Sequence, residues 1–192
     1  MRLPRIARGR PAGRVVFALL HLVTRRDVPD IVKVRFYRRR FFGTPFFNLG
    51  QRMLRGPSPW TVGERELIGA FVSAKNRCQF CATTHEAVAS AVLDPSITAA
   101  VIADWRTAEV DDGLKATLGF LEKLTLTPDE VQPRDARAVL DAGVSPEALR
   151  DAISICAAFN TINRVADGLD FTLPTNADRA MSTRVLLTVG YR

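Results

Sequence analysis

The chain has 192 residues, a net charge of +7 and three cysteines. That length suffices for one domain with a hydrophobic core, and so few cysteines argue against a secreted domain held together by disulfides. No segment reaches the roughly eighteen apolar residues that a membrane span needs. Residues Val15–Val23 are apolar, but no small-residue cleavage site follows them, so a signal peptide is not expected either. We therefore expect a cytoplasmic protein.

The positive charge is concentrated in the first third of the chain. Residues 1–60 carry a net charge of +12, and the remaining residues carry −5. Residues 1–14 combine five arginines with prolines and glycines, so we expect a basic, disordered arm there. Such a basic N-terminus could contact nucleic acid or an anionic membrane, although no recognition motif supports either. For residues 30–60 we favour packing against the acidic body of another subunit.

Apolar residues at helical spacing predict an all-α protein. Residues 15–57 are expected to form a helical N-terminal extension and residues 58–170 the main domain, followed by a C-terminal tail over residues 171–192. The one weak sign of a strand is the alternation at Val185–Val189. Glycine and proline separate the expected helices, which cover residues 15–25, 31–42, 46–54, 96–103, 110–124, 134–142 and 145–168, besides the pair described next.

Two further helices flank a short break in the main domain. Thr61 and Glu64 have the spacing of a capping box, so the first of these helices is expected to begin there. Asn76 tolerates the left-handed backbone conformation, so we place the break at Asn76–Arg77. Cys78 then lies in the first turn of the second helix, where free backbone N–H groups and the helix dipole favour a thiolate.

Four residues on either side of this break carry reactive groups. Cys78, Cys81 and His85 are separated by three and four positions, so they share one face of the second helix. Glu66 lies ten residues before the break and His85 nine residues after it. If the helices fold back on each other, the carboxylate and the imidazole meet. The sequence thus predicts a Glu–His pair beside two thiols, which can form a disulfide or, as a thiolate, attack a peroxide.

This constellation resembles the alkylhydroperoxidase D-like (AhpD-like), or carboxymuconolactone decarboxylase, family. The family pattern is a glutamate, eleven residues, Cys-x-x-Cys, three residues and a histidine. It is met without gaps by Glu66, Cys78, Cys81 and His85. Residues 64–68 and 159–169 are similar to the lead-in and the closing segment of the peroxidase-related branch. The resemblance spans roughly residues 58–170.

The resemblance implies an AhpD-like helical bundle, here with a basic N-terminal helical extension, that forms a homo-oligomer (a dimer, trimer or hexamer). It also implies a thiol-dependent peroxidase. In that activity Cys81 attacks a small hydroperoxide and Cys78 resolves the product as a disulfide, while Glu66 and His85 relay the proton. A dithiol, protein or small molecule, reduces the disulfide. No cofactor and no metal are expected. In one departure, Phe80 stands where family members often carry a further histidine.

Other interpretations of the same residues remain open. The position of Cys78 at a helix start favours it, rather than Cys81, as the attacking thiol. Two cysteines, a histidine and a glutamate could instead bind zinc, and a Cys-x-x-Cys pair can be accidental. The alternative functions are a non-catalytic redox-sensing or interaction protein of the same fold, and a carboxymuconolactone decarboxylase-like lyase.

The remaining polar or reactive side chains are expected to be structural. Cys156 lies in an apolar helical run and should belong to the core. His21 lies on the apolar N-terminal helix without a ligand-like neighbour. A polar stripe on the last long helix should anchor that helix by hydrogen bonds, and it consists of Asn160, Asn163, Arg164 and Asp167.

Overall fold

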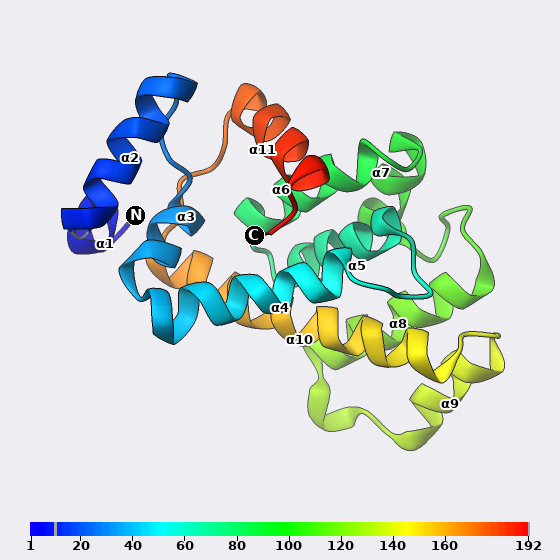
Figure 1. The fold of residues 1–192 in the computed structure, drawn as a ribbon. Coiled ribbons are helices and arrows are strands. Elements are labelled where there is room, and N and C mark those ends of the chain that lie inside the picture. Colours follow the sequence, from blue (N-terminus) through cyan, green and yellow to red (C-terminus); the bar gives the residue numbers. More distant parts are fainter. Residues whose placement is uncertain (10, 192) are drawn as a thin grey trace.

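The structure is a computed structural model that describes residues 1–9 and 11–191. All regular elements among these residues are helices, as the sequence predicted (Figure 1). A π-helical turn, Arg39–Gly43, precedes α4, and a 3₁₀ turn, Pro128–Glu130, precedes α9. The α-helices are α1 Pro4–Arg8, α2 Pro11–Thr24, α3 Asp30–Tyr37, α4 Thr44–Arg55, α5 Val62–Lys75, α6 Gln79–Ser90, α7 Pro95–Asp104, α8 Asp112–Leu126, α9 Pro133–Asp141, α10 Pro146–Leu169 and α11 Asn176–Thr188.

Helix α5 is the centre of the bundle. It packs against α4, α6, α8 and α10 (Figure 1). Every residue from Arg65 to Ser73 of α5 is buried, so the helix is enclosed on all sides, and Leu67, Ile68 and Phe71 are fully buried. Glu66 lies in this helix and is fully buried as well. The fold therefore places a carboxylate in the middle of its hydrophobic core, where an ionised group needs a partner.

The ends of α5 follow from local sequence. At its start the Thr61 hydroxyl accepts from the Glu64 backbone N–H (3.2 Å), and the Glu64 carboxylate accepts from the Thr61 N–H (2.7 Å), which is the predicted capping box. The break that follows is where the sequence placed it. However, Arg77 takes the left-handed conformation (φ 59°), and Asn76 stays helical (φ −74°). The Asn76 side chain is engaged elsewhere, in hydrogen bonds to α10.

The N-terminal residues differ from the expected disordered arm. Helices α1 and the start of α2 occupy the described part of residues 1–14, and Arg10 lies outside the described residues. Tertiary contacts explain the order. The Arg2 N–H donates to the Leu169 carbonyl (2.7 Å), and Ile6 is only 6% exposed because it packs in the core. These partners are distant in sequence, so composition alone could not reveal them.

The C-terminal residues also differ from expectation. The apparent strand alternation at Val185–Val189 falls largely within helix α11. Thr175 and Asp178 form a capping box that starts this helix. A short alternating run is compatible with either periodicity, and the capping signal here decides for the helix. Helix α11 then directs the last described residues back toward α4 and α6 (Figure 1).

Several apolar side chains of the N-terminal extension remain exposed. Leu22 and Val23 of α2 are 62% and 81% exposed, and Phe41 is 82% exposed. Phe41 lines an open apolar groove between α4 and α10, with a volume of about 550 Å³.

No helix among the described residues has both the length and the apolar character needed to cross a bilayer. The homo-oligomer suggested by the sequence stays a prediction.

Candidate active site

Glu66 and His85 meet across the α5–α6 pair. The Nδ1 atom of His85 lies 2.6 Å from Oε2 of Glu66. The Glu66 side chain is fully buried, and that of His85 is 11% exposed. The pairing is the one that counting residues on either side of the break predicts. With Glu66 ionised, the neutral imidazole carries its proton on Nδ1, and Nε2 is left as an acceptor.

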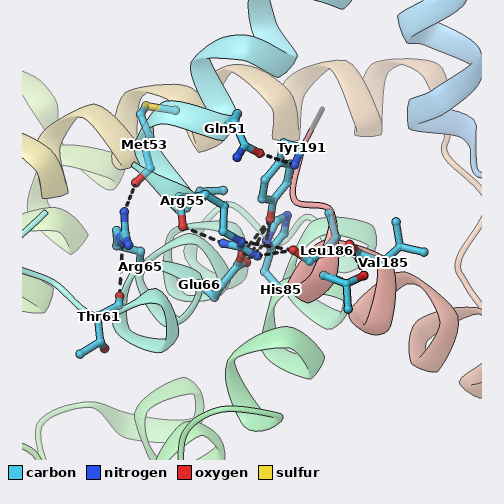
Figure 2. Close-up of polar contacts among 12 residues, drawn as sticks. Gln51, Met53, Arg55, Thr61, Arg65, Glu66, His85, Val185, Leu186 and Tyr191 are labelled. Carbon is cyan, nitrogen blue, oxygen red and sulfur yellow. Dashed lines mark hydrogen bonds and ion pairs between the residues drawn. The ribbon is translucent and has the colours of Figure 1, made fainter. Parts of the chain in front are cut away.

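Arg55 completes the environment of the carboxylate, and no sequence pattern indicates this role. Its Nη2 atom lies 2.6 Å from Oε1 of Glu66, and its side chain is only 11% exposed (Figure 2). The guanidinium also donates to the backbone carbonyls of Leu54 (2.7 Å) and Leu186 (3.1 and 3.2 Å). The only argument that the sequence offers is a general one, that a buried carboxylate requires a cation. The spacing of residues in the sequence does not show which arginine supplies that cation.

Tyr191 is the second residue that sequence reasoning missed. Its hydroxyl lies 2.9 Å from Oε1 and 3.2 Å from Oε2 of Glu66. Its ring stacks parallel to that of His85, with centroids 6.2 Å apart. The backbone N–H of Tyr191 donates to Oε1 of Gln51 (2.7 Å). The sequence predicted only a tail here, because nothing local connects Tyr191 to a glutamate 125 positions earlier.

These contacts determine the protonation states of Glu66 and Tyr191. Burial by itself would raise the pKa of Glu66, but His85 and Arg55 more than offset it, so the pKa lies below its ordinary value of 4.5. Burial, together with the Glu66 charge, raises the pKa of Tyr191 well above its ordinary value. At neutral pH Glu66 is therefore a carboxylate and Tyr191 a protonated phenol, so the phenol donates its hydrogen bond to the carboxylate.

The two thiols lie one turn apart at the start of α6. Cys78 is the N-cap residue and is 0% exposed, while Cys81 is 3% exposed. Hydrogen bonding from Cys81 lowers the pKa of Cys78, against the opposing effects of burial and Asp167. The same interaction, burial and the charge of Cys78 raise the pKa of Cys81 well above its ordinary value. Cys78 is thus the thiol that ionises first, in agreement with its position at a helix start.

Aromatic rings surround both pairs. Phe159 meets the His85 ring edge-to-face at 4.6 Å. Phe80, which stands where the resemblance led us to look for a further histidine, packs edge-to-face on Phe171 at 5.1 Å. Among the described residues no hydrogen bond joins His85 to either thiol. A proton can therefore pass between thiol and imidazole only through an intervening molecule, such as water or a bound peroxide.

Comparison with known proteins identifies the architecture. No family model and no curated protein matches the chain. A crystal structure of an uncharacterized peroxidase-related protein from Silicibacter sp. TM1040 is similar, with a TM-score of 0.74 and 22% identity over 88% of each chain. An uncharacterized peroxidase-related protein from Ralstonia eutropha JMP134, described as an alkylhydroperoxidase AhpD core, has a TM-score of 0.73 and 24% identity over 95% of each chain. The chain has an AhpD-like fold.

Two residues of the polar stripe, Asn160 and Asn163, anchor α10 in this AhpD-like bundle, as predicted, whereas Arg164 and Asp167 are exposed and Arg164 bonds to Asn160 of the same helix. The Asn163 amide donates to the Ser73 hydroxyl (3.0 Å) and accepts from Asn76 (2.9 Å), and Asn160 also accepts from Asn76 (3.1 Å). Asn163 is fully buried, so these bonds satisfy polar atoms that water cannot reach. Asn163 also hydrogen-bonds to Cys81, which connects the anchor to the thiol pair.

The other candidate residues of the sequence lie away from the site. Cys156 is 1% exposed and belongs to the core, as predicted, with its sulfur 3.4 Å from the Thr125 hydroxyl. His21 is exposed on α2, and its Nδ1 lies 3.0 Å from the carbonyl of Arg26. Among the described residues no three His, Cys, Asp or Glu side chains are grouped so that they could hold a metal ion.

Proposed function

We propose that the protein is a thiol-dependent peroxidase that reduces small hydroperoxides through a Cys78–Cys81 redox pair. The observation that carries the proposal is the placement of two free thiols on the same helix as a histidine held by a buried, ionised glutamate. The AhpD-like fold supports it, since two structural neighbours are named peroxidase-related.

The chemistry follows in two steps. A thiolate attacks one peroxide oxygen, the O–O bond breaks, and the sulfur becomes a sulfenic acid while an alcohol leaves. The second thiol then displaces water from the sulfenic acid and forms the disulfide. Nε2 of His85 accepts the proton released by a thiol and can return it to the leaving oxygen. An external dithiol supplies two electrons and two protons to regenerate the pair.

The ionisation of the pair and the family resemblance assign the first step differently. The resemblance implies that Cys81 attacks, whereas the lowered pKa of Cys78 makes Cys78 the thiolate. Because thiolate is the reactive form, we propose that Cys78 attacks and Cys81 resolves. Both sulfurs are almost fully shielded from solvent, so this assignment also favours compact hydroperoxides over bulky ones.

A steady-state assay with matched cysteine variants tests the proposal. Consumption of ethyl hydroperoxide, a compact substrate, is measured with dithiothreitol as the reductant for wild type, Cys78→Ser, Cys81→Ser, the double variant and Cys156→Ser. We expect loss of turnover in the first two variants and wild-type turnover in Cys156→Ser, because Cys156 lies in the core. Turnover that survives replacement of both Cys78 and Cys81 would overturn the proposal.

The shielded thiols and Phe80 favour one alternative, a redox sensor that oxidises without turning over. The same assay separates the two functions. A sensor consumes one equivalent of peroxide and then stops in the presence of excess dithiothreitol, whereas a peroxidase continues until the peroxide is exhausted.

A further inference from the structure

The segment after α11 docks beside Glu66 and His85, the pair proposed above to relay the proton. The Tyr191 ring lies against Gly50, where an added Cβ would be 3.7 Å from the ring, and the Tyr191 N–H donates to Gln51 (2.7 Å). Gly190 before it has a positive φ of 76°, and a Cβ there would overlap the Gln51 side-chain amide. Glycine is therefore required for the chain to turn and place Tyr191 between α4 and α6.

Helix α11, which delivers this segment, packs against α6 with side chains that are at most half-buried. None of its residues is buried. One tether is the Leu186 carbonyl, which accepts two hydrogen bonds from Arg55. Arg55 is also the cation of Glu66, and its guanidinium lies 5.1 Å over the Tyr191 ring. A helix without buried side chains is held weakly, and this one is held by the same side chain that pairs with the relay carboxylate.

The two oxygens of Glu66 have different closest partners, although the Tyr191 hydroxyl also lies 3.2 Å from Oε2. Oε1 receives the closest contacts of both Arg55 (2.6 Å) and the Tyr191 hydroxyl (2.9 Å), whereas Oε2 faces Nδ1 of His85 (2.6 Å) (Figure 2). Rotation of the carboxylate out of its present plane would weaken all three contacts. Donors on one oxygen thus hold the other oxygen toward the imidazole.

We propose that Tyr191 is a positioning residue of the relay, which is complete only when the segment after α11 is docked. The Tyr191 hydroxyl lies 3.3 Å from Nδ1 of His85 but closer to Glu66, at 2.9 Å from Oε1. Tyr191 therefore acts mainly through Glu66: it keeps Oε2 directed at His85 and so fixes the imidazole proton on Nδ1 and the free electron pair on Nε2. This inference rests on the proposed function, in which Nε2 accepts the thiol proton. Its test does not depend on peroxide turnover.

Nitrogen-15 NMR of the histidine rings measures the tautomer directly. The chain has two histidines, so a His21→Gln background leaves one ring signal. In the otherwise wild-type protein we expect the neutral His85 ring to be predominantly Nδ1–H. In Tyr191→Phe the population should shift toward the Nε2–H form. Tyr37→Phe, which removes the same hydroxyl from the chain's other tyrosine, should leave the ring signal unchanged.

A second pair of variants separates docking from the loss of the hydroxyl. Gly190→Ala keeps the phenol but clashes with Gln51, so it should produce the same tautomer shift as Tyr191→Phe. Gly143→Ala is its control, because Gly143 also has a positive φ (90°) but an added Cβ meets nothing within 4 Å. It should behave as wild type in the NMR spectrum.

The pH profile gives an independent readout. Loss of a hydrogen bond to a charged carboxylate raises its pKa, so in Tyr191→Phe the pKa of Glu66, followed by carbon-13 NMR of the side-chain carboxyl groups, should rise by about one unit. A Tyr191→Phe protein with the wild-type tautomer and the wild-type Glu66 pKa would overturn the inference. If both shift but no variant turns over peroxide, the positioning role stands and the proposed function fails.

Discussion

Replacing Arg55 with methionine should destabilise the protein far more than the loss of an exposed arginine would. The substitution keeps an unbranched side chain of similar length but removes the charge that pairs with Glu66 at 2.6 Å. Because the Glu66 side chain is fully buried, its carboxylate cannot turn to water for compensation. The bundle must then either hold an incompletely paired charge or protonate it.

The size of the effect follows from the remaining partners. Removal of one member of a buried ion pair costs about 3–5 kcal/mol. His85 and Tyr191 still contact the carboxylate, which favours the lower end of that range. The two hydrogen bonds to Leu186 are lost as well, at about 1 kcal/mol for such an interaction. We therefore expect a loss of about 3–4 kcal/mol in the free energy of unfolding at pH 7.

Urea denaturation at several pH values measures this loss and its cause. In wild type the pKa of Glu66 is lowered in the folded state. Its stabilising contribution is thus present above the ordinary value of 4.5 and is lost as the pH falls through the folded pKa. In Arg55→Met the folded pKa should rise above the unfolded one, so the penalty applies at high pH and disappears on acidification. The difference between variant and wild type should shrink toward acidic pH.

Two variants show whether the stability loss comes from the charge that pairs with Glu66 or simply from the loss of an arginine. Arg52→Met makes the same change on the exposed side of α4 and should cost little. Glu66→Gln combined with Arg55→Met removes both charges and should recover part of the stability. The reasoning is refuted if Arg55→Met is no less stable than Arg52→Met, or if its deficit is independent of pH.

Two further predictions concern the ring beside His85 and the thiols. Gly69→Ala should cost about 1–3 kcal/mol of stability and reduce peroxide turnover, because the added Cβ would overlap the Phe159 ring, which contacts His85. Gly168→Ala is the control, because an added Cβ there meets nothing within 4 Å. Thermal denaturation and activity assays should show a loss for Gly69→Ala and none for Gly168→Ala. Iodoacetamide near neutral pH should alkylate Cys78 before Cys81 in the reduced protein, because Cys78 has the lower pKa. Mass spectrometry maps the modified cysteine, and the reverse order would contradict the assignment of Cys78 as the thiolate.

The features that sequence could predict are those that depend on near neighbours. The capping box of Thr61 and Glu64 is a local hydrogen-bond pattern, so it located the start of α5. The meeting of Glu66 and His85 required one assumption, that two helices joined by a two-residue break are antiparallel. Counting residues from the break then placed both side chains at the same level, and the structure has them in contact.

The features that sequence could not predict depend on packing between distant segments. Arg55 reaches Glu66 from a helix of the N-terminal extension, and Tyr191 reaches it from beyond α11. Neither belongs to a motif, and a chain with many arginines gives no reason to single out one of them. The left-handed residue shows the same limit on a smaller scale. Asn76 was the better local candidate, but its side chain is needed for the bonds to α10, and Arg77 takes the turn instead.

The central claim is that Cys78 and Cys81 form a disulfide when a peroxide reacts with the reduced protein. Intact mass and free-thiol count after one equivalent of ethyl hydroperoxide, without added reductant, test it most directly. We expect a product about 2 Da lighter than the reduced chain, with Cys156 as the remaining free thiol. A chain that keeps all three thiols while the peroxide persists would contradict the account.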